Sequence, residues 1–225
     1  MTGEAPATES MRSEPILRVI RAYDDWIIRT YCWVRFWVLR QRFLDEIGQY
    51  LPERGTILDL GSGFGLFSLY YAQILPDARF RGVDLSRRRV EMARRAADRL
   101  SLANVTYEVG DATDWRADDE YAAAYMLDIV HHIDEESVRP LLEQLRKALR
   151  PGGRLIVKDV NTRPTYKRWF TYLLDRLMVP RGMIRYWSAD ELQRLLEEVG
   201  FQVHRHLMVD YLPYPHVLYI CQREE

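Results

Sequence analysis

The chain has 225 residues, of which 48% are hydrophobic and 29% are charged, and its formal net charge is −1. This length and composition predict one globular domain, with or without an appendage. The near balance of charges argues against a dedicated nucleic-acid-binding protein, which usually carries a basic excess.

The cysteines and the amino-terminal segment indicate the compartment. Cys32 and Cys221 lie far apart and outside any CxxC spacing, so we interpret them as buried thiols and expect no metal centre or disulfide framework. Residues 1–14 are mostly small and polar and predict a flexible tail, with no signal peptide. No apolar run approaches the roughly 18 residues that cross a bilayer. We therefore expect a cytoplasmic protein.

Residues 15–50 are rich in aromatic side chains and predict a helical cap, built from one long helix or two short ones. Their apolar positions follow the three-and-four spacing of a helix. This stripe consists of Ile16, Ile20, Tyr23, Ile27, Tyr31, Val34 and Val38.

The sequence does not decide what this cap packs against, because Trp26, Trp33 and Trp37 lie partly outside the stripe. The segment could pack on both sides within its own domain, or cover a hydrophobic substrate. It could also lie at a membrane surface as an interfacial helix. Anionic lipid would suit its arginines, which are Arg29, Arg35, Arg40 and Arg42.

A glycine-rich turn follows the first predicted strand, residues 56–60. Gly61, Gly63 and Gly65 are spaced by two, and an apolar helical pattern begins at once. Such a turn leaves backbone N–H groups pointing at whatever lies above the sheet edge. It therefore predicts a cradle for a nucleoside-like ligand, with an ordinary tight turn as the alternative.

Strands and helices then alternate along the chain, which is typical of a doubly wound α/β fold. After a helix from Ser188 to Gly200, two strands joined by a short loop predict a closing hairpin. We therefore predict a mostly parallel seven-stranded sheet with an antiparallel last strand, interrupted by a second cap segment at about 160–187. The strands are expected at residues 56–60, 79–83, 104–109, 121–127, 154–159, 201–209 and 216–221.

Acidic residues follow the predicted strands at the edge that carries the glycine turn. Asp84 ends the second strand, where a carboxylate usually accepts from two ribose hydroxyls. Asp111 follows the third strand beside Ala112 and could accept from the exocyclic amine of adenine. The dinucleotide pattern requires a glycine at position 66, which is Leu66 here, so a nicotinamide cofactor is disfavoured.

Several motifs occur in one order along about a hundred residues: LDLGSGFG at 58–65, VDLS at 83–86, GDA at 110–112, MLDIVHHI at 126–133 and LRPGGRLIV at 149–157. Together they resemble the class I S-adenosylmethionine-dependent methyltransferases of the ubiquinone-biosynthesis type. The resemblance implies S-adenosyl-L-methionine as cofactor and a methyltransferase domain over residues 51–225. It does not extend to residues 1–50 or 160–187, where such enzymes build substrate-specific caps.

The resemblance also implies roles for individual residues. Asp59, Gly61 and Gly63 would hold the methionine end, and Gly65 would complete the turn. The remaining cofactor contacts would be Asp84 to the ribose, Leu85, Asp111 and Ala112 to the adenine, and Leu127 to the methionine side.

Two histidines are the candidate catalytic residues. His131 and His132 follow the fourth strand, and a histidine with a pKa of about 6.5 suits a general base for a hydroxyl acceptor. Structural hydrogen bonding is the alternative role. The candidate substrate contacts are Tyr23, Asp159, Trp169, Tyr186, Tyr214 and His216.

We therefore predict methyl transfer, most simply to oxygen, on a hydrophobic small molecule of aromatic, prenylated or lipid-like character. The alternatives are a methyltransferase acting on RNA or protein and a non-catalytic nucleoside-binding protein of the same fold. No nucleic acid is expected as a partner, and peripheral contact with a membrane extends the small-molecule hypothesis. The sequence makes no prediction of oligomeric state.

Overall fold

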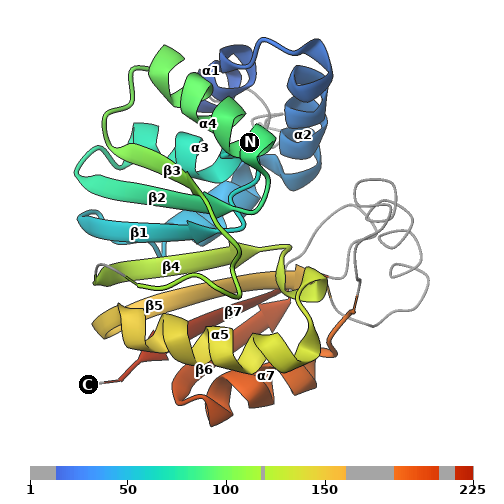
Figure 1. The fold of residues 1–225 in the computed structure, drawn as a ribbon, viewed down its shortest axis with the longest axis vertical. Coiled ribbons are helices and arrows are strands. Elements are labelled where there is room, and N and C mark those ends of the chain that lie inside the picture. The colour runs from blue at the N-terminus through green and yellow to red at the C-terminus, as the bar shows by residue number, and fades with distance from the viewer. Residues whose placement is uncertain (1–13, 118–119, 161–184, 208–215, 225) are drawn as a thin grey trace, which may run out of the picture.

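A computed structural model describes residues 14–117, 120–160, 185–207 and 216–224. They contain a seven-stranded sheet in the order β3-β2-β1-β4-β5-β7-β6 (Figure 1). β7 is antiparallel to β5 and β6, and the other neighbours are parallel, so the predicted α/β sheet is confirmed. The strands are β1 (Gly55–Leu60), β2 (Ala78–Asp84), β3 (Val105–Val109), β4 (Tyr121–Leu127), β5 (Leu149–Val160), β6 (Phe201–Leu207) and β7 (His216–Arg223).

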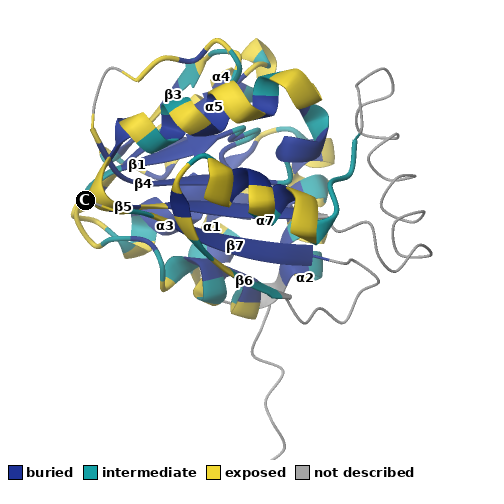
Figure 2. Ribbon diagram, turned by 90° about the horizontal axis from the view of Figure 1, so that it is seen from below, coloured by how far each residue is buried: buried dark blue, intermediate teal, exposed yellow. Residues whose placement is uncertain are grey.

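Helices cover both faces of this sheet, and the strands are largely buried between them (Figure 2). One face packs against α1 (Glu14–Ala22), α2 (Trp26–Gly48), α3 (Leu66–Ile74) and α4 (Arg87–Arg99). The other packs against α5 (Glu135–Ala148) and α7 (Ala189–Glu198), and the short 3-10 helix η1 (Val130–His132) follows β4. Among the described residues, no helix has the length and apolar character needed to cross a membrane.

The amino-terminal segment is two helices, and its apolar stripe differs from the prediction. Glu14, which the sequence analysis assigned to the tail, begins α1. The helical conformation is interrupted after α1, and the Asp25 side chain caps α2 by accepting from Ile27 N. The break changes the helical phase, so Ile27 and Val34 are exposed. The side chains of α2 that are buried instead include Ile28, Cys32, Phe36, Leu39 and Phe43.

β5 begins earlier than predicted, because Pro151-Gly152-Gly153 does not precede the strand but lies within it. Gly152 has a φ of 71°, and the register with β4 shifts between Tyr121 and Ala123. A glycine of this kind in a strand is typical of a bulge. The strand then runs to Val160 and places Lys158 and Asp159 near its carboxyl end.

Candidate functional site

The glycine turn connects β1 to α3 and is fixed to the neighbouring strand. The N–H groups of Gly61 and Ser62 both donate to the Val83 carbonyl of β2, at 2.8 and 3.0 Å. Gly61 and Gly65 have φ of 80° and 79°, and a Cβ on Gly65 would lie 2.5 Å from the Tyr107 hydroxyl. These two positions therefore require glycine. A Cβ on Gly63 would meet nothing within 4 Å, so the space above the middle of the turn is open.

Asp84 lies directly beside this turn, at the end of β2. Its Oδ2 accepts from Gly63 N at 2.8 Å, and its Oδ1 accepts from Ser86 N at 2.9 Å. Each carboxylate oxygen has a further lone pair for a ligand hydroxyl. Leu85 follows with 71% of its surface exposed, which an adenine ring could cover.

The remaining predicted adenine contacts lie nearby. Gly110 N donates to the Asp84 carbonyl at 3.1 Å, which places the segment after β3 next to β2. Asp111 is exposed and accepts from the backbone N–H and the hydroxyl of Thr113. Its contact with adenine stays a prediction, as does that of the half-buried Ala112. Leu127 is buried at the end of β4.

Asp59 is only 3% exposed near the carboxyl end of β1, and its contact with the methionine end stays a prediction. Burial raises the pKa of its carboxyl to about 7, and the negative charge of Asp84 acts in the same direction. Between pH 3.8 and about pH 7, the folded protein thus favours the protonated form of Asp59, whereas the unfolded chain favours the carboxylate.

Asp59 should make the folded protein less stable as the pH rises. Its pKa is about 7 in the folded state against 3.8 as the ordinary value, so its contribution to stability is present below pH 3.8 and lost as the pH rises through 7. Between pH 5 and pH 7 we expect a loss of about 2 kcal/mol. Urea unfolding of wild type and Asp59→Asn should show this slope in the wild type only. A parallel slope in both proteins would contradict the assignment.

His131 and Asp159 form a buried pair at the carboxyl ends of β4 and β5. The Nδ1 of His131 lies 2.5 Å from Asp159 Oδ1, and the His131 backbone N–H donates to Oδ2 at 3.0 Å. His131 is 1% exposed and Asp159 is 3% exposed. The His132 and Tyr186 rings lie 4.1 and 5.5 Å from the His131 ring. Four predicted site residues therefore come together here.

An ion cluster beside this pair was not predicted from the sequence. Asp128, with a φ of 59°, contacts the guanidinium of Arg35 from α2 and lies 2.5 Å from the Nζ of Lys158. Lys158 is 0% exposed, and its Nζ lies 5.7 Å from the centre of the Phe43 ring. Burial disfavours the charge on Asp128, but Lys158 and Arg35 outweigh it and hold the pKa of Asp128 well below its usual range.

The sequence did contain one signal for this cluster, which is a lysine in the middle of the apolar run of β5. His216, a predicted substrate contact, is buried at the start of β7, and its charge would also lower the pKa of Asp128. It therefore lies near the ion cluster.

The junction between α1 and α2 packs directly on the glycine turn. The Tyr23 hydroxyl donates to the Phe64 carbonyl at 2.6 Å, and the Tyr31 ring lies 5.6 Å from the Phe64 ring. Arg89 of α4 covers the same phenyl ring at 5.6 Å. Tyr23 thus contacts the turn through a hydrogen bond, and its contact with substrate stays a prediction. The predicted contacts Trp169 and Tyr214 lie outside the described residues.

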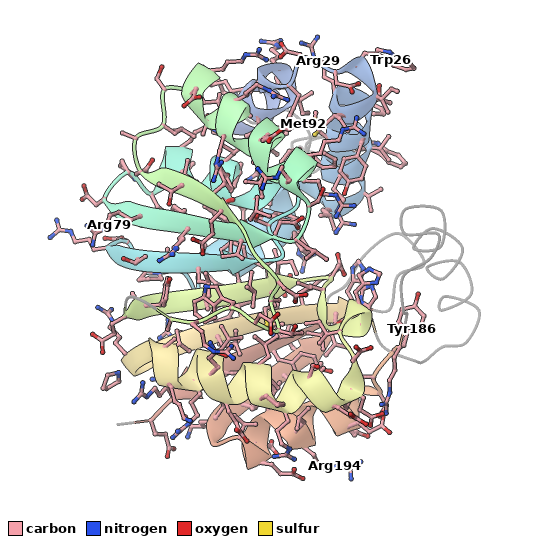
Figure 3. The ribbon with its side chains drawn as sticks, in the orientation of Figure 1. Trp26, Arg29, Arg79, Met92, Tyr186 and Arg194 are labelled. Atoms are coloured by element: carbon pink, nitrogen blue, oxygen red, sulfur yellow. The ribbon has the colours of Figure 1, made fainter. Side chains whose placement is uncertain are left out.

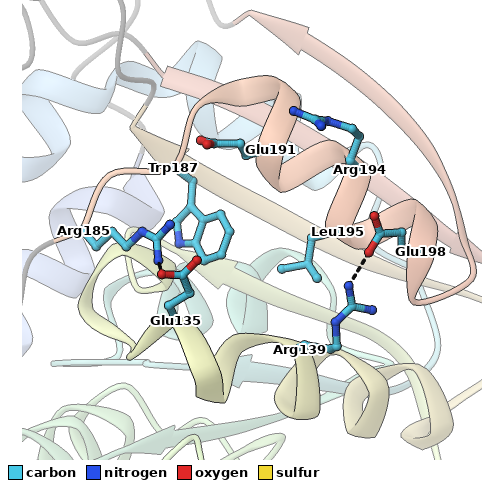
Figure 4. A pocket seen from close by; sticks show the side chains of 8 residues that line it. All are labelled: Glu135, Arg139, Arg185, Trp187, Glu191, Arg194, Leu195 and Glu198. Carbon is cyan, nitrogen blue, oxygen red and sulfur yellow. Dashed lines mark hydrogen bonds and ion pairs between the residues drawn. The ribbon is translucent and has the colours of Figure 1, made fainter.

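A pocket of about 390 Å³ lies elsewhere, between α5 and α7 (Figure 4). Most of the side chains in its walls are charged, and Arg139 forms an ion pair with Glu198. The guanidinium of Arg185 lies over the Trp187 ring, at 4.7 Å from its centre. It contains none of the predicted site residues. The candidate site is therefore the strand edge beside the glycine turn.

This arrangement defines a class of protein: a Rossmann-like α/β protein with a candidate nucleoside site at a glycine turn and a polar strand edge beside it. Residues 33–206 match the family described as "Methyltransferase domain", and the chain belongs to this family.

Known proteins agree with this membership. The chain is 33% identical over 172 residues to "O-methyltransferase cnsE" of Penicillium expansum, covering 74% of this chain and 59% of that protein. It is 29% identical over 168 residues to "27-O-demethylrifamycin SV methyltransferase" of Amycolatopsis mediterranei, covering 72% and 60%. The chain thus spans about 60% of the length of these relatives. A SAM-dependent methyltransferase structure from Methanosarcina mazei matches with a TM-score of 0.66 at 18% identity, covering 80% and 97%.

S-Adenosylmethionine is the cofactor that this family and fold imply, and the residues present fit it. The open space above Gly63 admits a ligand close to the backbone. Asp84 presents carboxylate oxygens at the ribose position, and exposed Leu85 presents an apolar surface at the adenine position.

Proposed function

We propose that the protein transfers a methyl group from S-adenosylmethionine to a hydroxyl of a hydrophobic small molecule. The observation that carries the oxygen assignment is the buried His131–Asp159 pair at the ends of β4 and β5. The O-methyltransferase named among the relatives supports the same class of acceptor. We further propose that residues 15–50 act as a cap on a methyltransferase domain over residues 51–225 of a cytoplasmic protein.

The cofactor, when bound, supplies a methyl group that is already activated for transfer. The chain contributes binding and orientation: the glycine turn and Asp84 hold the nucleoside, and Tyr23 holds the turn. For an acceptor brought to the strand edge, proximity to the activated methyl group and alignment with it would lower the barrier.

His131 would act as the general base for the acceptor hydroxyl. Asp159 accepts from Nδ1–H, which fixes the tautomer and makes Nε2 the nitrogen that takes the proton. The Asp159 carboxylate then stabilises the imidazolium that forms. His132 lies on the same short helix and provides a matched comparison.

Calorimetry and product analysis test this function. The purified protein should bind S-adenosylmethionine and S-adenosylhomocysteine but not NAD. It should then release S-adenosylhomocysteine when offered phenols or hydrophobic alcohols, with the mass of one methyl group gained by the acceptor. Binding of NAD without either sulfur ligand would contradict the proposal. Binding of both sulfur ligands without turnover on any hydroxyl would contradict the acceptor class.

His131→Ala should lower kcat by about 10²–10⁴-fold, the usual contribution of a general base. Asp159→Asn should also lower kcat and shift the acidic limb of the pH–rate profile to lower pH, because the amide no longer stabilises the imidazolium. The affinity for S-adenosylmethionine should stay unchanged in both, and His132→Ala should keep wild-type turnover. Equal rates in wild type and His131→Ala would show that proximity alone suffices.

A further inference from the structure

The outward face of α2 carries large apolar side chains that the fold does not cover. Trp26, Trp33 and Trp37 are 73%, 47% and 47% exposed. At about 100° per residue, positions 26, 30, 33 and 37 fall on one line along a helix, and positions 27 and 34 lie beside it. Ile27 and Val34 occupy those positions and are 57% and 43% exposed. We call these five apolar side chains the outer face of α2.

The opposite side of α2 already supplies the contact with the domain. Its buried side chains, including Cys32, Phe36 and Leu39, belong to the core on that side of the sheet. Single exposed apolar residues are normal on protein surfaces, but a contiguous apolar patch usually marks an interaction site. Trp26 lies at the outer end of the α1–α2 pair, away from the sheet (Figure 3).

Basic side chains predominate around the outer face, although Asp24 and Asp25 precede its amino-terminal end. Between Trp26 and Leu44 the sequence has four arginines and no acidic residue, although the whole chain has a net charge of −1. Arg29 and Arg42 are exposed, and their helical positions lie on opposite flanks of the outer face. At the start of α2, Arg88 of α4 pairs with Asp25 at 3.7 Å, so the acidic cap of the helix is itself partly neutralised.

We propose that the outer face of α2 docks on an anionic lipid surface. Tryptophan rings suit the boundary between headgroups and acyl chains, and arginine stems can lie along apolar surface while their charges stay at the headgroups. A second copy of the chain fits less well. Symmetric pairing of two outer faces would bring arginines against arginines, with no acidic residue in the stretch from Trp26 to Leu44 to balance them.

Docking here would place the cap against the lipid surface, in which a hydrophobic methyl acceptor would dissolve. The same helix reaches the candidate site from its inner side, through Tyr31 against Phe64 and Arg35 against Asp128. Binding to lipid does not depend on catalysis, so it can be measured separately from methyl transfer.

Vesicle flotation tests the proposal. The full chain should float with vesicles of phosphatidylcholine and phosphatidylglycerol, float less with phosphatidylcholine alone, and detach as salt screens the arginines. Replacing Trp26, Trp33 and Trp37 together by serine should lower the bound fraction about 10-fold or more, because most of the buried apolar area is removed. Ile74 and Val109 are 44% and 42% exposed on other elements, so Ile74→Ser with Val109→Ser is the matched control and should bind as wild type.

Two further measurements make the result decisive. Circular dichroism and calorimetry with S-adenosylmethionine should show that the triple variant stays folded. Binding to both vesicle types that is unchanged in the triple variant would overturn the proposal. A wild-type protein that binds neither type of vesicle would also overturn the proposal. This holds equally if sedimentation shows that the outer face forms a dimer, or if the outer face binds an acidic protein.

Discussion

Asp84→Ala is expected to lower the affinity for S-adenosylmethionine by about 10²–10⁴-fold. A carboxylate that accepts from two ribose hydroxyls makes charged hydrogen bonds of about 1.5–3 kcal/mol each. The substitution also removes the acceptor of Gly63 N, at 2.8 Å, and should loosen the turn that is predicted to hold the methionine end. Isothermal titration calorimetry measures the change directly.

A ligand comparison separates the ribose contact from the support of the turn. Wild type should bind S-adenosylhomocysteine much more tightly than its 2′,3′-dideoxy analogue, whereas Asp84→Ala should bind the two alike. Asp84→Asn keeps one acceptor oxygen, so its discrimination between the two ligands should lie between those of wild type and Asp84→Ala. If Asp84→Ala discriminates between the two ligands as well as wild type does, Asp84 does not contact the ribose.

The parts of the fold that follow from local pattern were predicted well. Strands β1 to β4 and the turn at Gly61, Gly63 and Gly65 follow from short apolar runs, a helical period and glycines. The cap was harder, since a single stripe was assumed from Ile16 to Val38. The phase changes where Arg29 donates to the Tyr23 carbonyl and Asp25 caps α2, and no periodicity shows such contacts in advance.

The polar edge at the ends of β4 and β5 was predictable only in part, because its pairs are remote in sequence. His131 and Asp159 were each singled out, but their contact spans 28 residues. The contact between Arg35 and Asp128 spans 93, and the sequence alone gave no reason to join them. A lysine within an apolar strand indicates a buried partner, but it does not say which acidic residue will meet it.

The largest expected loss of stability comes from Asp128→Ala. It would leave Lys158, which is 0% exposed, without the carboxylate 2.5 Å from its Nζ. Breaking a buried pair on one side typically costs about 3–5 kcal/mol. Since a domain is stable by only about 5–15 kcal/mol, chemical unfolding should show a large fall in midpoint. Asp24→Ala, which breaks the exposed pair with Arg99, is the control and should cost far less.

The pH dependence of this loss distinguishes an unpaired charge from a simple cavity. Burial already lowers the pKa of Lys158, and without Asp128 that pKa should fall further. The folded variant would then bind fewer protons than the unfolded chain, so its stability should rise with pH toward the ordinary lysine pKa of 10.5. Lys158→Met added to Asp128→Ala should restore much of the stability, because the fully buried ammonium that lost its carboxylate is then removed. A loss that is independent of pH and is not restored by Lys158→Met would show that packing around Asp128, and not the charge of Lys158, holds the cap to the sheet.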